Sequence, residues 1–216
     1  MQNDWVPLSS SALVIGAMSL VLGAAMNPAE AGSTATQTLR VATDESTRWL
    51  AMAVMYTLAS VTIVLGLPAV LSLVQERGHR LGLVGACIFC VGAIGTCSYA
   101  MLLVFFRAMV VAGAVRGQGL DRVTNDPGLV VFLSGWIGCF YLGVLLLAAA
   151  LLRARTTPRW VPVLLGMFLV TAPVAPDLGR FGATVHVMLL AVACTGAAMA
   201  AVSRGQRALV PAKPAY

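Results

Sequence analysis

Long apolar runs alternate with short polar segments along almost the whole of this 216-residue chain. A helix needs about 20 mostly apolar residues to cross a bilayer, and most of the runs approach or exceed that length. The six runs cover residues 7–26, 49–74, 81–106, 128–152, 160–175 and 181–202. We therefore predict an all-α, polytopic transmembrane bundle of six helices, forming a single domain over residues 1–216.

Polar segments separate the runs and contain residues that end helices. The turn sequence Asn125-Asp126-Pro127-Gly128 precedes the fourth run, and Pro173 and Pro176 end the fifth. We expect three of these segments to form loops on the outer side of the membrane. These loops cover residues 27–48, 107–127 and 176–180. The third apolar stretch continues past Arg107, so we expect its helix to extend beyond the membrane.

Composition excludes a soluble enzyme and gives no support for a nucleic-acid partner. Only 10% of the residues are charged and 59% are hydrophobic, whereas soluble domains carry about 25% charged residues. The net charge of +6 comes from cations scattered between the apolar runs, with no basic block. These cations are instead topology signals at the ends of membrane spans.

The distribution of the cations predicts the orientation of the bundle. Eight lie on the side of the second loop, the fourth loop and the C-terminal tail: Arg77, Arg80, Arg153, Arg155, Arg159, Arg204, Arg207 and Lys213. Six lie on the other side. Because cytoplasmic loops carry the excess of positive charge, we predict that both termini are cytoplasmic. We expect an integral protein of a bacterial plasma membrane.

Three acids are candidate catalytic residues. Glu30, Asp126 and Asp177 each lie within a few residues of a span and near a proline that fixes the local backbone. Carboxyl groups at membrane depth are costly and usually functional. The alternative for all three is an ordinary loop charge in contact with water.

Aromatic residues and one histidine form a candidate substrate site. Trp136 and Phe140 lie four residues apart on the fourth run, with Tyr141 beside them. The second run adds Tyr56 and Trp49, and the sixth contains His186. Aromatic faces stabilise cations, and a histidine can hold a carboxylate or relay a proton. The alternatives are core packing for the rings, an interface anchor for Trp49, and a histidine bonded to a backbone carbonyl.

The sequence offers no metal or cofactor site. Its only two histidines, His79 and His186, fall on opposite predicted sides of the membrane. Cys87 and Cys90 have the spacing of a redox motif, but buried thiols in apolar surroundings are usually inert. We therefore expect neither a metal nor an organic cofactor.

Part of the chain resembles a group of small actinobacterial membrane proteins. The resemblance covers roughly the first half of the chain and lies in the segments Asn27-Pro28-Ala29-Glu30, Thr47-Arg48-Trp49, Gly66-Leu67-Pro68 and Arg77-Gly78-His79-Arg80-Leu81-Gly82. In size and layout the chain is similar to the membrane-bound terpene cyclases of natural-product pathways, which close the prenyl chains of prenylated indoles and meroterpenoids. The resemblance implies a lipophilic substrate, drawn from the membrane.

These observations lead to two hypotheses. In the first, the protein is a terpene cyclase in which Asp177 or Glu30 donates a proton to a prenyl chain and Asp126 assists. A carboxylic acid in an apolar site stays protonated near neutral pH, as this chemistry requires. In the second, the bundle is non-enzymatic: an accessory subunit, a small-molecule binder or a resistance factor. It would then pack against partner helices or a second copy of itself.

Overall fold

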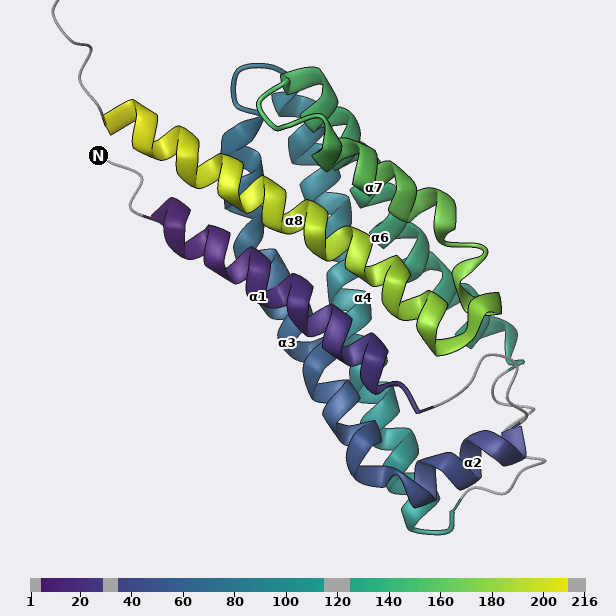
Figure 1. The fold of residues 1–216 in the computed structure, drawn as a ribbon. Helices are drawn as coiled ribbons and strands as arrows, with labels where there is room; N and C mark the ends of the chain where they lie inside the picture. Colours follow the sequence, from purple (N-terminus) through teal and green to yellow (C-terminus); the bar gives the residue numbers. More distant parts are fainter. Residues whose placement is uncertain (1–4, 29–34, 115–124, 210–216) are drawn as a thin grey trace, which may run out of the picture.

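The structure is a computed structural model that describes residues 5–28, 35–114 and 125–209. All of its elements within these ranges are helical (Figure 1). They are α1 (Trp5–Met26), α2 (Ala35–Asp44), α3 (Ser46–Leu73), α4 (His79–Val111), α6 (Pro127–Ala154), α7 (Trp160–Thr171), the short 3-10 helix η1 (Ala175–Leu178) and α8 (Gly179–Leu209).

The prediction of an all-α transmembrane bundle is confirmed. Within the described ranges, five helices are long and apolar enough to cross a membrane: α1, α3, α4, α6 and α8. The fifth predicted crossing is shorter than expected, because α7 ends at Thr171 rather than at residue 175. Its 12 residues rise about 18 Å, against about 30 Å of hydrocarbon. Pro173 explains the early end, since proline lacks the N–H that a continuing helix needs.

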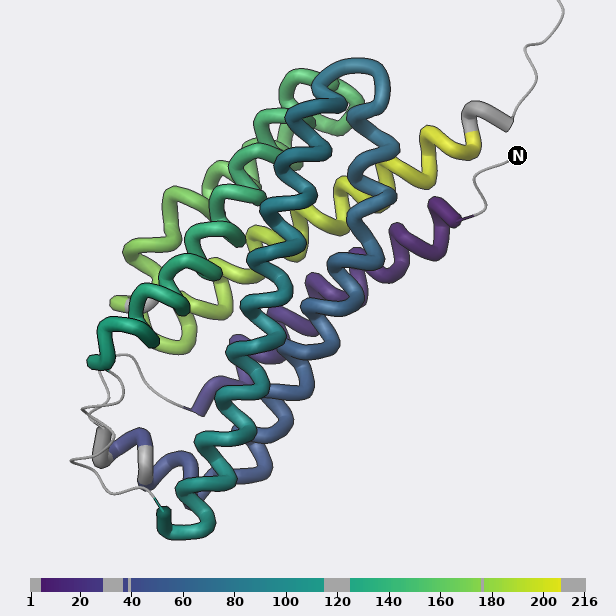
Figure 2. The backbone as a smooth tube through the Cα atoms, turned by 180° about the vertical axis from the view of Figure 1, so that it is seen from behind, coloured from purple at the N-terminus to yellow at the C-terminus, as the bar shows by residue number. Residues whose placement is uncertain are grey.

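The six long or apolar helices form a closed ring. Neighbouring helices pack in the order α1, α3, α4, α6, α7, α8 and back to α1, and α3 also contacts α8. Figures 1 and 2 show the beginning of α1 and the end of α8 next to each other at one end of the bundle. Both ends of the described chain therefore lie at the same end of the bundle.

Glycines let neighbouring helices approach closely in this ring. A Cβ atom added to Gly66 of α3 would lie 2.6 Å from the Cα of Leu13 in α1. A Cβ atom added to Gly143 of α6 would lie 2.6 Å from the Cα of Phe89 in α4. Any larger residue at these positions would push backbone against backbone, so the glycines fix the helix spacing.

The predicted outer loop at residues 27–48 contains a helix that the sequence pattern did not indicate. Helix α2 covers Ala35–Asp44 and packs on α3 and α4 near the start of α3 and the end of α4. Its Ala42 is fully buried in a small apolar cluster with Trp49 and Leu103. This part of the loop is ordered because its few apolar residues meet an apolar surface formed by two other helices.

Arg107 ties the end of α4 to the start of α3. Helix α4 continues past Arg107 to Val111, as expected from the length of the third apolar stretch. The Nε atom of Arg107 donates a hydrogen bond to the backbone oxygen of Ser46, at 3.0 Å. The guanidinium group therefore helps to fix α4 against α3 at the end of the bundle where α3 begins.

Candidate functional site

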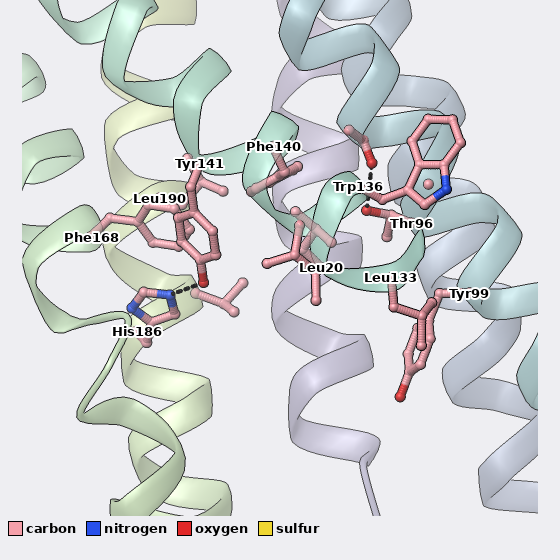
Figure 3. Close-up of a pocket in the computed structure, with 14 residues that line it drawn as sticks. Leu20, Thr96, Tyr99, Leu133, Trp136, Phe140, Tyr141, Phe168, His186 and Leu190 are labelled. Atoms are coloured by element: carbon pink, nitrogen blue, oxygen red, sulfur yellow. Dashed lines mark hydrogen bonds between the residues drawn. The ribbon is translucent and has the colours of Figure 1, made fainter. Parts of the chain in front are cut away.

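A cavity of about 320 Å³ lies between helices of this ring (Figure 3). Five helices contribute to its walls: Leu20 from α1; Gly92, Gly95, Thr96 and Tyr99 from α4; Leu133, Trp136, Ile137, Phe140 and Tyr141 from α6; Phe168 from α7; and His186, Val187 and Leu190 from α8. Apart from a few hydroxyl and ring nitrogen atoms, these side chains are apolar. The cavity therefore suits a lipophilic molecule.

Two glycines of α4 position the aromatic wall. A Cβ atom on Gly92 would lie 2.4 Å from the backbone nitrogen of Phe140, and one on Gly95 would lie 2.4 Å from the Cβ of Trp136. Without side chains at these two positions, α6 lies directly against the backbone of α4. This contact holds Trp136 and Phe140 at the cavity wall.

His186 is the centre of the polar part of the wall. Its side chain is only 7% exposed. The Nε2 atom lies 3.1 Å from the hydroxyl oxygen of Tyr141, and the Nδ1 atom lies 2.8 Å from the hydroxyl oxygen of Thr171. These hydrogen bonds join α6, α7 and α8, and Figure 3 shows the one between Tyr141 and His186. The histidine is thus satisfied by two side-chain hydroxyls, rather than by the carboxylate or backbone carbonyl considered from the sequence.

Phe168 completes this cluster and was not among the residues proposed from the sequence. Its ring stacks on His186 at a centroid distance of 4.2 Å and on Tyr141 at 5.4 Å. Thr171 was also missed. Phe168 and Thr171 are three residues apart and so share one face of α7, but α7 is apolar on all sides and nothing in the sequence marks that face as the inner one.

The structure brings four of the proposed substrate-binding residues together and places two elsewhere. Trp136, Phe140, Tyr141 and His186 all line the cavity. Trp49 does not, because it is 4% exposed beneath α2 and its indole nitrogen donates to the backbone oxygen of Leu103, at 3.1 Å. Tyr56 also lies outside the cavity wall and packs against Tyr99, with ring centroids 6.3 Å apart.

The proposed catalytic acids do not reach the cavity in the part of the chain that the structure describes. Asp126 is the N-cap of α6, and its carboxylate accepts a hydrogen bond from the backbone N–H of Leu129 at 2.9 Å. It lies about two helical turns before Leu133, the first lining residue of α6. Asp177 is exposed in η1, and its carboxylate bonds to no described residue. Glu30 lies outside the described residues.

The thiols of the candidate redox motif are unpaired. Cys87 is exposed on α4 and Cys90 is half-buried, and both are free, as are the other three cysteines. Neither residue of the motif lines the cavity. The site is therefore made of aromatic rings, aliphatic side chains and the hydrogen-bonded trio of Tyr141, His186 and Thr171.

Comparison of the chain with protein-family models, with curated proteins and with solved structures finds no match in any of the three. The expectations that came from the resemblance to terpene cyclases therefore stay predictions.

Proposed function

We propose that this protein binds a small lipophilic molecule with an isoprenoid-like chain inside the membrane. The observation that supports this proposal is the cavity of about 320 Å³, whose wall combines aromatic rings with Leu133, Val187 and Leu190. A greasy chain concentrates in the bilayer, so a cavity inside a transmembrane bundle can receive it without passage through water. Apolar walls stabilise such a chain by removing its surface from polar surroundings.

The volume of the cavity indicates the size of the group that it can hold. Ligand cavities usually measure about 300–1,000 Å³, so the 320 Å³ found here is at the small end. A water molecule occupies about 30 Å³ of liquid, which gives room for at least about ten water-sized groups. A ten-carbon geranyl chain matches that capacity better than a complete farnesylated aromatic compound.

A second candidate function is cyclisation of the bound prenyl chain. The four rings of Trp136, Phe140, Tyr141 and Phe168 at the wall favour it, because aromatic faces stabilise the carbocations that form during cyclisation. In this proposal one of Asp177, Glu30 and Asp126 donates the initiating proton. Asp126 and Asp177 lie at the end of the bundle where α6 and α8 begin, so the reacting end of the chain would extend from the cavity towards that end.

Photoaffinity labelling tests the binding proposal. The protein in lipid nanodiscs would be irradiated with a geranyl probe that carries a diazirine, and the labelled peptides identified by mass spectrometry. We expect labelling of α6 and α8 at the lining residues, with competition by unlabelled geraniol. Val187→Phe, which fills the cavity, should reduce the labelling strongly. Val192→Phe makes the same change at an exposed position of the same helix and should leave it unchanged.

The outcome that contradicts the binding proposal is labelling confined to lipid-facing positions such as Val192, or labelling that is the same in both variants. Either result would mean that the probe partitions into lipid rather than entering the cavity. The nanodisc without protein, irradiated under the same conditions, supplies the background for lipid labelling.

Cyclisation is tested separately, with membranes that contain the protein and a panel of geranylated and farnesylated aromatic compounds. Cyclisation conserves mass, so we expect a product of unchanged mass and altered retention time. Its loss in the Asp177→Asn, Glu30→Gln double variant would assign the proton donor to these acids. A product that persists undiminished in that variant would remove the assignment. If no substrate gives an isomer, cyclisation is refuted and the binding proposal remains.

A further inference from the structure

The hydrogen bonds around Thr171 determine where the protons lie in the polar trio. The Thr171 hydroxyl oxygen lies 2.9 Å from the backbone oxygen of Met167 and 3.2 Å from that of Phe168. A carbonyl oxygen only accepts, so the single hydroxyl proton of Thr171 points to the backbone, as is usual for threonine in a helix. The hydroxyl oxygen then accepts from His186, whose Nδ1 atom carries a proton and lies 2.8 Å away.

This arrangement fixes the role of Tyr141. With its proton on Nδ1, the neutral imidazole ring of His186 has a lone pair on Nε2. The Tyr141 hydroxyl therefore donates its proton to Nε2 across 3.1 Å. The phenolic oxygen retains its acceptor lone pairs, and its own proton is no longer free for a ligand. At the cavity wall, Tyr141 thus acts as a hydrogen-bond acceptor.

Besides Tyr141 and His186, three polar side chains line the wall: those of Thr96, Tyr99 and Trp136. The Thr96 hydroxyl donates to the backbone oxygen of Gly92 in its own helix, at 3.2 Å. Figure 3 shows Tyr99 on the opposite side of the close-up from Tyr141 and His186. The buried indole nitrogen of Trp136 has no hydrogen-bond partner among the described residues, but an N–H group only donates and so cannot accept a proton from a ligand. The hydrogen-bonded polar pair of the wall is Tyr141 with His186, and the body of the cavity between α4, α6 and α8 is largely apolar.

We infer that the ligand is an isoprenoid alcohol whose hydroxyl group donates a hydrogen bond to the Tyr141 oxygen, while its prenyl chain fills the apolar body of the cavity. This inference rests on the proposed function and adds the ligand's chemical class and its orientation. An aldehyde or an ether of the same chain length has an acceptor oxygen but no proton to donate. The oxygen of such a molecule and the oxygen of Tyr141 would both be acceptors, so no hydrogen bond could form between them.

A competition experiment with matched ligands tests the inference. Geraniol, geranial and geranyl methyl ether have the same ten-carbon chain and would each compete with the diazirine probe for the wild-type protein in nanodiscs. A hydrogen bond contributes about 0.5–1.5 kcal/mol net, so geraniol should compete at about two- to tenfold lower concentration than the other two. Tyr141→Phe should remove this preference, and Tyr56→Phe, which alters a tyrosine outside the cavity wall, should retain it.

The outcomes distinguish a failure of the inference from a failure of the proposed function. Equal competition by the three ligands in the wild-type protein would overturn the inference and leave the binding proposal in place. A preference for geraniol that survives Tyr141→Phe would also overturn it, because the hydroxyl would then bind elsewhere. Absence of specific labelling at the cavity would overturn both. The wild-type comparison depends on no variant, so a folding defect in Tyr141→Phe does not obscure the result.

Discussion

The contact between α4 and α6 at Gly92 allows a quantitative prediction for Gly92→Ala. The added methyl group would lie 2.4 Å from the backbone nitrogen of Phe140 and 2.5 Å from its Cα atom. Ordinary contacts of a Cβ atom begin at 3.4 Å, so the two helices must move apart by about 1 Å at this point. Because the atoms in the way are backbone atoms, no change of side-chain rotamer can relieve the contact.

The expected loss of stability follows from this overlap. Overpacking of a well-packed interior costs about 1–3 kcal/mol. Replacing glycine by alanine in a helix interior stabilises the helix by up to about 1 kcal/mol in water. This stabilisation is smaller here, because transmembrane helices remain helical when they separate in lipid. We therefore expect Gly92→Ala to lower the free energy of unfolding by about 1–2 kcal/mol. It should also weaken ligand binding, because Phe140 lines the cavity.

Titration of the purified protein from mild detergent into sodium dodecyl sulfate, followed by tryptophan fluorescence, measures this loss. Gly138→Ala is the matched control, since a Cβ atom at Gly138 of α6 would meet nothing within 4 Å. It should unfold at the same point as the wild-type protein or slightly later. If Gly92→Ala unfolds together with Gly138→Ala, the close approach of α4 and α6 at Gly92 is refuted, and with it the position of the aromatic wall.

Three further predictions concern the ends of the helices. Asp126→Ala should cost about 1 kcal/mol in the same titration, because it removes the N-cap bond to Leu129. Asp126→Asn should leave the stability nearly unchanged, because asparagine caps a helix equally well. If this variant loses an activity at unchanged stability, Asp126 has a chemical role besides capping. Glu76→Gln should change stability by less than about 0.5 kcal/mol, because its ion pair with Arg204 is exposed to solvent; a larger loss would mean that the pair is desolvated in the membrane. Fusions of green fluorescent protein to either terminus should fluoresce and fusions of alkaline phosphatase should be inactive, and the reverse pattern would refute cytoplasmic termini.

Several features of the site had a signal in the sequence. The stripe of Trp136 and Phe140 with Tyr141 beside it indicated a shared helix face, and all three residues line the cavity. The capping role of Asp126 was also readable, since an aspartate followed by proline and an apolar run is typical of a helix start. Trp49 carried no such signal, because its partner Leu103 comes from α4, 54 residues away.

The sequence by itself determined that the chain is a helical membrane bundle and where most of its helices lie. A bilayer demands about 20 apolar residues for each crossing, and that demand is met locally, within each segment. Only the tertiary structure decided which residues meet in the cavity. Tyr141, Thr171 and His186 come from three helices that are apolar on all sides, so no amphipathic stripe marks the face that turns inward. Glycine contacts and helix packing between distant segments select those faces, and they act only once the helices have assembled.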